Sequence, residues 1–174
     1  MAETPALELN STINAVCAHL RNFFVLPTQK MARRFELTNG TILLPLELKI
    51  GQRVWIEPTG EHTEAYGSYR IKTKLSADIG EFLYGLDGLE GISDTWQGTI
   101  YGQRIPPDFI SLCESIATWE AANQPSNLIS ESISGFYKKT LATGENGLPA
   151  DAYEVFAKGL ARFPKRMFTG VRYS

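Results

Sequence analysis

The chain has 174 residues, of which 43% are apolar. This length suits one domain with a substantial hydrophobic core and is short for two complete domains. Seventeen Lys and Arg residues nearly balance nineteen Asp and Glu residues, so the formal net charge is only -2. The overall charge therefore gives no reason to propose nucleic acid or a membrane as a partner. No apolar run approaches the ~20 residues of a transmembrane helix.

A first amphipathic helix is predicted over residues 10–26. Asn10 or Ser11 is a suitable N-cap, and Pro27 ends the helix because proline cannot continue the backbone hydrogen-bond ladder. Apolar residues recur between them at helical spacing, namely Ile13, Val16, Cys17, Leu20 and Phe24. We expect residues 1–9 to form a loose or partner-ordered arm, and residues 29–34 to form a basic, solvated connector.

Residues 33–101 carry the signals of a small antiparallel β-module. Asn39-Gly40 lies between two apolar runs and predicts a tight hairpin, because both residues tolerate the positive φ angles of such a turn. A glycine-rich stretch at 80–91 suits another strand followed by a flexible tip. We expect a small sheet or a partly closed barrel. Its further strands are predicted from alternating apolar and polar residues at 52–57, 66–74 and 95–101.

Two more helices are predicted in the second half of the chain. Pro107 suits the first turn of a helix that ends near Asn123, since proline lacks only an N–H that would be unpaired there. The apolar face of this helix consists of Phe109, Leu112, Cys113, Ile116 and Trp119. Pro149 opens the third helix, whose apolar face consists of Ala152, Val155, Phe156, Gly159, Leu160 and Phe163.

These elements predict an α+β fold in which the β-module is inserted after the first helix. The helical part comprises residues 10–26 and 106–168. We expect its three main helices to form a small bundle, with the β-module as a separate lobe. Leu20, Ile116 and Phe156 are predicted to meet in the core of that bundle.

Residues 129–140 predict an extended and partly exposed arm. The run is rich in serine, aromatic residues and lysine, and it shows no helical stripe. An exposed extended segment must pair with another strand or be protected from pairing, so we expect strand addition to a neighbouring protein chain. The candidate contact residues are Glu131, Ile133, Phe136, Tyr137, Lys138 and Lys139.

The C-terminal tail, residues 164–174, is basic and aromatic. No acidic residue follows Glu154, whereas five cations do. A solvated chain end with cations at a helix C-terminus is one explanation. We favour docking on another protein, because the tail keeps its aromatic residues beyond the helix-breaking Pro164, and we place proximity to DNA second. The candidate docking residues are Lys158, Arg162, Lys165, Arg166, Met167, Phe168, Arg172 and Tyr173.

The sequence offers little for catalysis. Its two histidines, His19 and His62, lack partners at metal-ligand spacing, and both are interpreted as structural or solvated residues. Cys17 and Cys113 lie in apolar helical stripes, where a reduced cysteine acts as a small hydrophobic residue. We therefore expect no enzymatic activity, no catalytic residue, no metal and no cofactor.

Several stretches of the sequence form a characteristic series. They are Phe35-Glu36-Leu37-Thr38-Asn39-Gly40-Thr41-Ile42, Ile50-Gly51-Gln52-Arg53-Val54, Trp96-Gln97-Gly98-Thr99-Ile100, Pro106-Pro107-Asp108-Phe109-Ile110, Ser130-Glu131-Ser132-Ile133-Ser134-Gly135-Phe136-Tyr137, and the aromatic and basic close at 156–168. In order and spacing this series resembles the head-to-tail connector, or adaptor, proteins of long-tailed bacteriophages, in particular the group with a β-insert after the first helix. The resemblance covers residues 10–168.

The resemblance implies a structural virion protein, with residues 1–174 as a single connector domain. About twelve copies would form a ring beneath the portal protein and extend the DNA channel toward a stopper, head-completion or tail-completion protein. Double-stranded DNA would pass through without sequence-specific binding, and no membrane is involved. We expect assembly in the host cytoplasm and a final place in the virion neck. The alternative is a small β-barrel module that binds a peptide or ligand.

Overall fold

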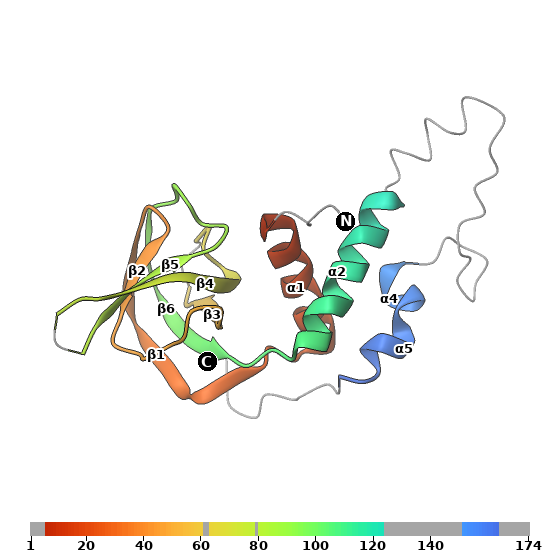
Figure 1. Ribbon diagram of the computed structural model, residues 1–174, viewed down its shortest axis with the longest axis horizontal. Coiled ribbons are helices and arrows are strands. Elements are labelled where there is room, and N and C mark those ends of the chain that lie inside the picture. Colours follow the sequence, from red (N-terminus) through yellow and green to blue (C-terminus); the bar gives the residue numbers. More distant parts are fainter. Residues whose placement is uncertain (1–5, 61–62, 79, 124–150, 164–174) are drawn as a thin grey trace.

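The fold is α+β, with two long helices on one side of a β-barrel (Figure 1). The computed structural model describes residues 6–60, 63–78, 80–123 and 151–163. Its helices are α1 (Ala6–Leu20), α2 (Pro107–Ala122), α4 (Ala152–Val155) and α5 (Ala157–Leu160). Its strands are β1 (Val25–Thr38), β2 (Thr41–Leu44), β3 (Arg53–Pro58), β4 (Gly67–Ser76), β5 (Phe82–Leu86) and β6 (Asp94–Gln103). No helix in this described part is long and apolar enough to cross a membrane.

The six strands form a closed barrel in the order β1-β2-β5-β4-β3-β6, and every neighbouring pair is antiparallel. The predicted tight hairpin at Asn39-Gly40 is confirmed, with φ angles of 50° and 75° at these two residues. Glycine is required at position 40 for a second reason, because a Cβ atom there would lie 2.6 Å from the carbonyl oxygen of Leu89. The turn therefore packs directly against the loop that follows β5.

The barrel begins earlier than the predicted module. The prediction of a solvated connector at 29–34 is wrong, because these residues belong to β1 and pair with β6 from Lys30 onward. Lys30 and Arg34 are exposed, whereas Met31 packs against the barrel core. Arg33 occupies the next inward position, so the charge at 33 hid the alternating pattern of this strand.

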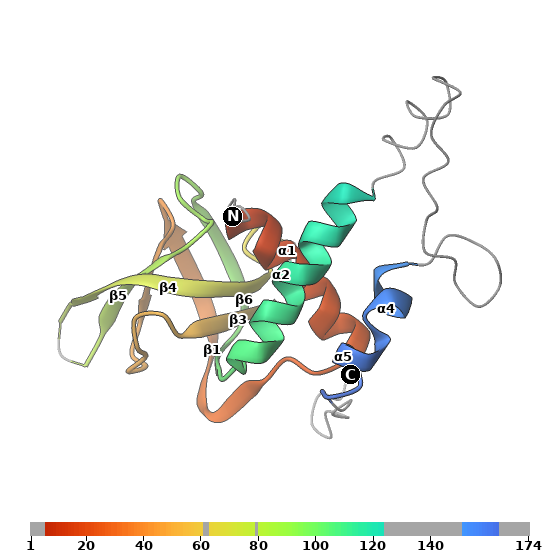
Figure 2. The same cartoon turned by 45° about the vertical axis from the view of Figure 1, so that its right-hand side comes forward.

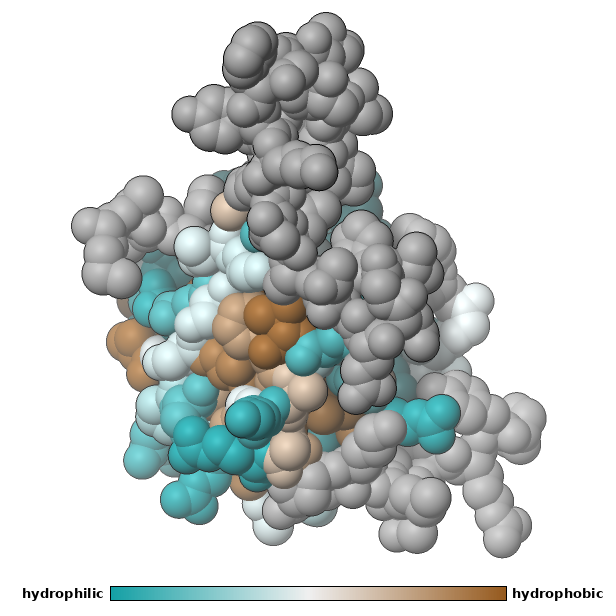
Figure 3. All heavy atoms as spheres, turned by 90° about the vertical axis from the view of Figure 1, so that its right-hand side faces the viewer, coloured by the Kyte–Doolittle hydropathy of each residue, from teal (hydrophilic) through white to brown (hydrophobic). Residues whose placement is uncertain are grey.

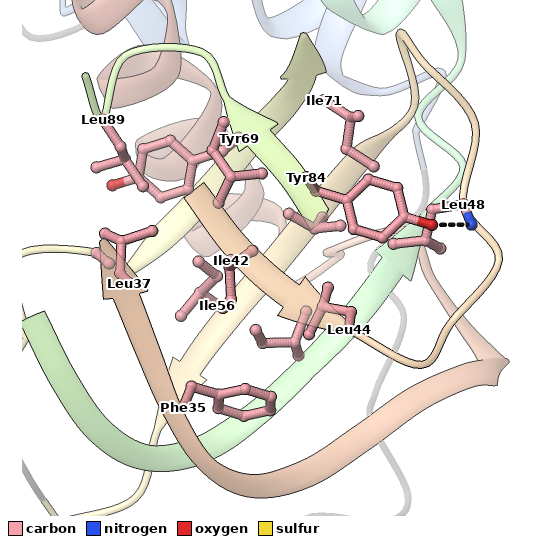
Figure 4. Close-up of a cluster of buried hydrophobic side chains, with 14 of the residues drawn as sticks. Phe35, Leu37, Ile42, Leu44, Leu48, Ile56, Tyr69, Ile71, Tyr84 and Leu89 are labelled. Atoms are coloured by element: carbon pink, nitrogen blue, oxygen red, sulfur yellow. Dashed lines mark hydrogen bonds between the residues drawn. The ribbon is translucent and has the colours of Figure 1, made fainter. Parts of the chain in front are cut away.

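Side chains fill the barrel interior. Phe35, Ile42, Leu44 and Tyr84 come from three different strands and gather in the space between them (Figure 4). The only polar group among these four side chains is the Tyr84 hydroxyl, which donates to the carbonyl oxygen of Leu46 at 2.6 Å and accepts from the N–H of Leu48 at 2.9 Å. The loop after β2 is thereby tied to a buried ring of β5.

A second core lies between the helices. Cys17 and Leu20 of α1 and Ile116 of α2 are buried there, and Phe156 packs against them, as predicted. The predicted single third helix is instead two one-turn helices, α4 and α5, so a bundle of three main helices is not confirmed. Gly159 lies against α2, where a Cβ atom would come within 2.9 Å of the Leu112 side chain.

Helix α1 starts before the predicted cap. It begins at Ala6, so the prediction of a loose arm through residue 9 is wrong for its last four residues. Asn10 lies inside the helix, and its side chain donates to the carbonyl oxygen of Asp87 at 3.2 Å instead of capping the helix end. The helix ends at Leu20, ahead of Phe24 and Pro27, and Arg21 adopts a positive φ of 51°.

The buried hydroxyl of Tyr84 gives a stability prediction. Substitution Tyr84→Phe leaves the Leu48 N–H and the Leu46 carbonyl without their partner, so we expect the free energy of unfolding to fall by about 1–3 kcal/mol. The measurement is urea denaturation followed by tryptophan fluorescence. Tyr66→Phe is the control, because the Tyr66 side chain is 48% exposed. Equal midpoints for the two variants would contradict the proposed role of the hydroxyl.

Candidate interaction surfaces

The junction between barrel and helices is polar and centres on Arg53 of β3. The partly buried guanidinium donates from Nε to the Ser68 hydroxyl and from Nη2 to the Ser68 carbonyl, both at 2.9 Å, and also from Nη2 to Oδ1 of Asn10. Burial lowers the pKa of Arg53 from its usual 12.5 to about 10. The side chain stays protonated at neutral pH, because these oxygen atoms replace the water that it has lost.

Further hydrogen bonds extend this junction across three elements. The N–H of Ser68 donates to Oδ1 of Asn14 at 2.8 Å, and the Ser68 hydroxyl donates to Oε1 of Gln103 at 2.6 Å. Nε2 of Gln103 in turn donates to the carbonyl oxygen of Phe23 at 2.8 Å. Gly67 leaves room for this arrangement, since a Cβ atom there would lie 2.2 Å from Nδ2 of Asn14. The junction fixes how α1 sits on β3, β4 and β6.

Sequence reasoning missed this junction. Asn10 was interpreted as a helix cap, and Arg53 as one residue of an alternating strand. One signal was available, because Asn10 and Asn14 are four residues apart and therefore lie on the same face of a helix. Two amides on one helical face indicate a polar partner for that face, but the sequence does not identify Arg53 and Ser68 as that partner.

The junction gives a second stability prediction. Arg53→Leu leaves Asn10 and Ser68 without their charged donor, so we expect a loss of about 2–3 kcal/mol in the free energy of unfolding. The control is Arg70→Leu on β4, whose side chain is 56% exposed and pairs with Asp87 at 2.8 Å. An exposed ion pair contributes about 0–1 kcal/mol, so the control should lose no more than that. Chemical denaturation of both variants makes the comparison, and equal losses would contradict it.

The structure describes two of the eight predicted docking residues in the C-terminal region. Lys158 lies on α5 and is exposed. Arg162 follows α5, and its Nη2 is 3.5 Å from a carboxylate oxygen of Asp108 in the first turn of α2. Both side chains of this ion pair are more than half exposed, at 70% and 51%. The other predicted docking residues, Lys165, Arg166, Met167, Phe168, Arg172 and Tyr173, lie outside the described residues.

The predicted arm at 129–140 also lies outside the described residues, together with its candidate contacts Glu131, Ile133, Phe136, Tyr137, Lys138 and Lys139. The helical side of the molecule presents apolar surface. Figure 3 shows apolar side chains gathered on the face that carries α4 and α5. Val155 of α4 contributes to the exposed apolar surface of the chain, with 39% of its area accessible.

The opposite side of the barrel carries a second apolar feature, which we term the outer leucine row. Leu43 of β2 is paired with Leu83 of β5, and Leu83 is paired with Leu75 of β4. Directly paired residues of neighbouring strands share one face of the sheet. This face is the outer one, because Ile42 and Tyr84, the neighbours of Leu43 and Leu83 in sequence, are buried in the barrel core. Leu75 is 62% exposed.

A third exposed feature lies on the outer faces of β1, β6 and β3. Nζ of Lys30 is 5.6 Å from the ring centre of Tyr101, a distance at which a cation is attracted to an aromatic ring. Nearby, Tyr66 packs edge-on against Trp55, with 5.3 Å between ring centres. Burial raises the pKa of Glu57 and the positive charge of Lys30 opposes that rise. This face thus combines the half-exposed ring of Tyr66 and the partly exposed ring of Tyr101 with charges of both signs.

The groups that usually carry catalysis are dispersed or buried in the described part. There, no cluster of three or more His, Cys, Asp or Glu residues suits a metal ion. The imidazole of His19 stacks on Tyr153 with ring centres 4.1 Å apart, and His62 lies outside the described residues. Both cysteines are buried, and burial raises the pKa of Cys17 to about 12 and that of Cys113 further still.

The raised thiol pKa values predict slow chemical modification. The thiolate is the reactive form of cysteine, and at pH 8 its fraction at Cys17 and Cys113 falls as the pKa rises. We expect native protein to react with a disulfide reagent such as DTNB on the order of 100-fold more slowly than protein in guanidinium chloride. The absorbance of the released thiol measures both rates. Similar rates in the two states would show that the thiols are accessible in the folded protein.

Comparisons of the chain with models of protein families, with curated proteins and with solved structures find no match. The function of the chain is therefore inferred from its residues, its geometry and the resemblance of its motifs.

Proposed function

We propose that the protein is a structural component of the neck of a long-tailed bacteriophage. About twelve copies form a ring beneath the portal, connect the head to the tail and continue the DNA channel. The supporting observation is the place of the barrel between α1 and α2. The two helices pack on each other in a core of their own, and the entire β-module is inserted between them, after the first helix. This is the arrangement that the motif series leads us to expect.

Binding by such a protein uses its outer surfaces, because side chains fill the barrel. The proposal assigns the C-terminal residues from Lys158 onward to the portal, and the arm at 129–140 to a neighbouring copy or to a stopper or tail-completion protein. A bundle of three main helices, with the short α4 and α5 as parts of the third, belongs to the same proposal. DNA passes through the channel without sequence-specific contacts, and the protein carries out no chemistry.

A small β-barrel module that binds a peptide or ligand is the second candidate function. The observation that favours it is the aromatic outer face, where Tyr66 is 48% exposed beside Trp55 and Lys30 lies over Tyr101. Half-exposed aromatic rings near a cation suit a peptide better than they suit duplex DNA. Under this function the substitution Tyr66→Ala removes binding, whereas under the neck function it leaves attachment to the portal unchanged.

The decisive experiment is a pull-down on the portal protein of the same phage. We expect the full chain to be retained and a chain truncated after Phe163 to be lost, because the truncation removes all six docking residues outside the described part, three of them cations, while leaving both cores intact. Exposed ion pairs contribute only about 0–1 kcal/mol each and weaken in salt, so retention of the full chain should fall between low and high salt.

Two controls make the pull-down specific. Circular dichroism of the truncated chain checks that its fold is unchanged. The substitution Tyr66→Ala in the full chain tests the aromatic face separately. Equal retention of the full and truncated chains at both salt concentrations would show that the tail is a solvated end, and loss of retention through Tyr66→Ala would favour the second candidate function.

A further inference from the structure

The hairpin formed by β4 and β5 projects beyond the rest of the barrel, and one of its edges is open (Figures 1 and 2). β4 pairs with β5 as far as Ser76, but its ladder with β3 ends at Arg70. The last contacts on that side join Ile71 to the backbone of Gln52 and Gly51, each at 2.8 Å. Among the described strands, residues 72–76 therefore have a partner on one side only. We term this segment the open edge of β4.

The direction of the backbone groups along this edge follows from two observations. The ladder is irregular between Ile71 and Thr73, which is the mark of a bulge. Beyond it, the N–H of Ala77 donates to the carbonyl oxygen of Glu81, toward β5. Backbone groups of successive residues in an antiparallel strand point to opposite sides, so those of Lys74 and Ser76 point away from β5. They are the donors and acceptors that an added strand would use.

The outer leucine row offers an added strand a side-chain contact as well as backbone hydrogen bonds. The row runs from Leu43 through Leu83 to Leu75 and ends at the open edge. A strand added beside β4 with an apolar residue next to Leu75 would lengthen the row by one residue. It would also cover Leu75, the most exposed leucine of the row. Main-chain hydrogen bonds and a side-chain contact would then act together, as they do in strand addition generally.

The ladder between β1 and β2 is also interrupted, and a side chain fills the gap. β1 pairs with β2 at only two positions, Leu37 and Thr38. Across the gap, Nη2 of Arg33 donates to the carbonyl oxygen of Leu43 at 2.7 Å, and Nη1 lies 3.8 Å from Glu81. An incoming strand would have to displace this arginine. At the open edge of β4 the corresponding contact is the ion pair of Lys74 with Glu47 of the loop after β2, at 3.8 Å, in which the Glu47 side chain is 83% exposed.

We propose that the open edge of β4 accepts residues 129–139 of a second copy of this chain as an added strand. The inference rests on the proposed function for its choice of a second copy, since a ring requires contacts between identical chains. The sequence of the segment fits the edge. Ile129, Ile133 and Tyr137 alternate with serines and share one face of a strand, so one of them can lie beside Leu75. Glu131 shares this face and brings a negative charge to the edge that carries Lys72.

The geometry indicates that the added strand comes from another copy of the chain. The described chain before the segment stops at Asn123, just past the end of α2, and both views place that end across the barrel from the β4–β5 hairpin (Figures 1 and 2). Residues 124–128 span at most about 18 Å when fully extended. If residues 129–139 of the same chain were to reach β4, this short connection would have to pass around the barrel.

Lys72 and Lys74 favour this partner over the alternative in which the open edges of β4 from two copies pair with each other. Nζ of Lys72 lies 3.1 Å from Glu90, and Nζ of Lys74 lies 3.8 Å from Glu47 and 4.3 Å from the ring centre of Phe82. Two open edges brought together would place four lysines along one seam, and like charges on an edge strand oppose such pairing. In residues 129–139 the lysines, Lys138 and Lys139, lie at one end, so the part around Glu131 and Ile133 adds no positive charge to the seam. The same lysines protect the edge while the chain is alone.

The test uses a fluorescent synthetic peptide of residues 127–141 and the full chain at low micromolar concentration. Anisotropy measures binding, and hydrogen exchange measures protection of the Lys74 and Ser76 amides. We expect saturable binding and slower exchange at these two amides. Leu75→Asp in the chain should weaken binding at least tenfold. Its matched control is Ile50→Asp, a substitution at an apolar residue that is 64% exposed but lies in the turn before β3.

A second pair of variants tests the peptide side. Ile133→Asp in the peptide should weaken binding at least tenfold, whereas Ser132→Asp, on the opposite face of the strand, should change it no more than twofold. Equal effects within either pair, or binding without protection of β4, would overturn the proposal. A peptide that fails to bind while the full chain is still retained on portal overturns this inference alone. Binding with protection of β4, in a chain that portal does not retain, supports the inference and removes the neck function.

Discussion

The structure depends on one partly buried charge. The Arg53 guanidinium of β3 lies where the barrel meets α1, and the atoms that it binds come from β4 and α1. A charge removed from water is stable only when fixed oxygen atoms surround it, so the positions of Asn10 and Ser68 are set by this requirement. An apolar junction of the same size would tolerate sliding and rotation. A junction of directed hydrogen bonds holds the helices in one orientation on the barrel.

This orientation gives the molecule two different ends. The barrel end carries the outer leucine row and the open edge of β4, and the helical end carries apolar side chains around α4 and α5 (Figures 1 and 3). Two unlike surfaces on opposite ends suit head-to-tail contacts between copies, which close into a ring when the rotation between copies allows it. A flexible joint between barrel and helices would spread that rotation over many values. In the proposed ring, the polar junction would link the fold of one chain to the shape of the assembly.

The sequence predicted the elements whose signals are local. Asn39-Gly40 identified the first hairpin, Pro107 identified the start of α2, and the apolar stripe of α1 identified its buried face. It failed where a residue serves a distant partner. Arg33 interrupts the apolar alternation of β1 because it bridges to β2, so part of that strand was interpreted as a connector. Arg53, Asn14 and Gln103 are separated widely in sequence, and no pattern in one sequence joins them.

The neighbouring positions of β1 and β6 have a consequence for how the chain reaches its fold. β1 follows α1, β6 precedes α2, Val25 is paired with Gln103, and the N–H of Arg104 donates to the carbonyl oxygen of Phe24 at 2.8 Å. Before these strands pair, α1 and α2 are the ends of a long flexible loop, and bringing them together has a large entropic cost. Once the ladder closes, only a few residues separate each helix from the paired ends of β1 and β6. The barrel thus reduces the loop-closure entropy that opposes pairing of the two helices.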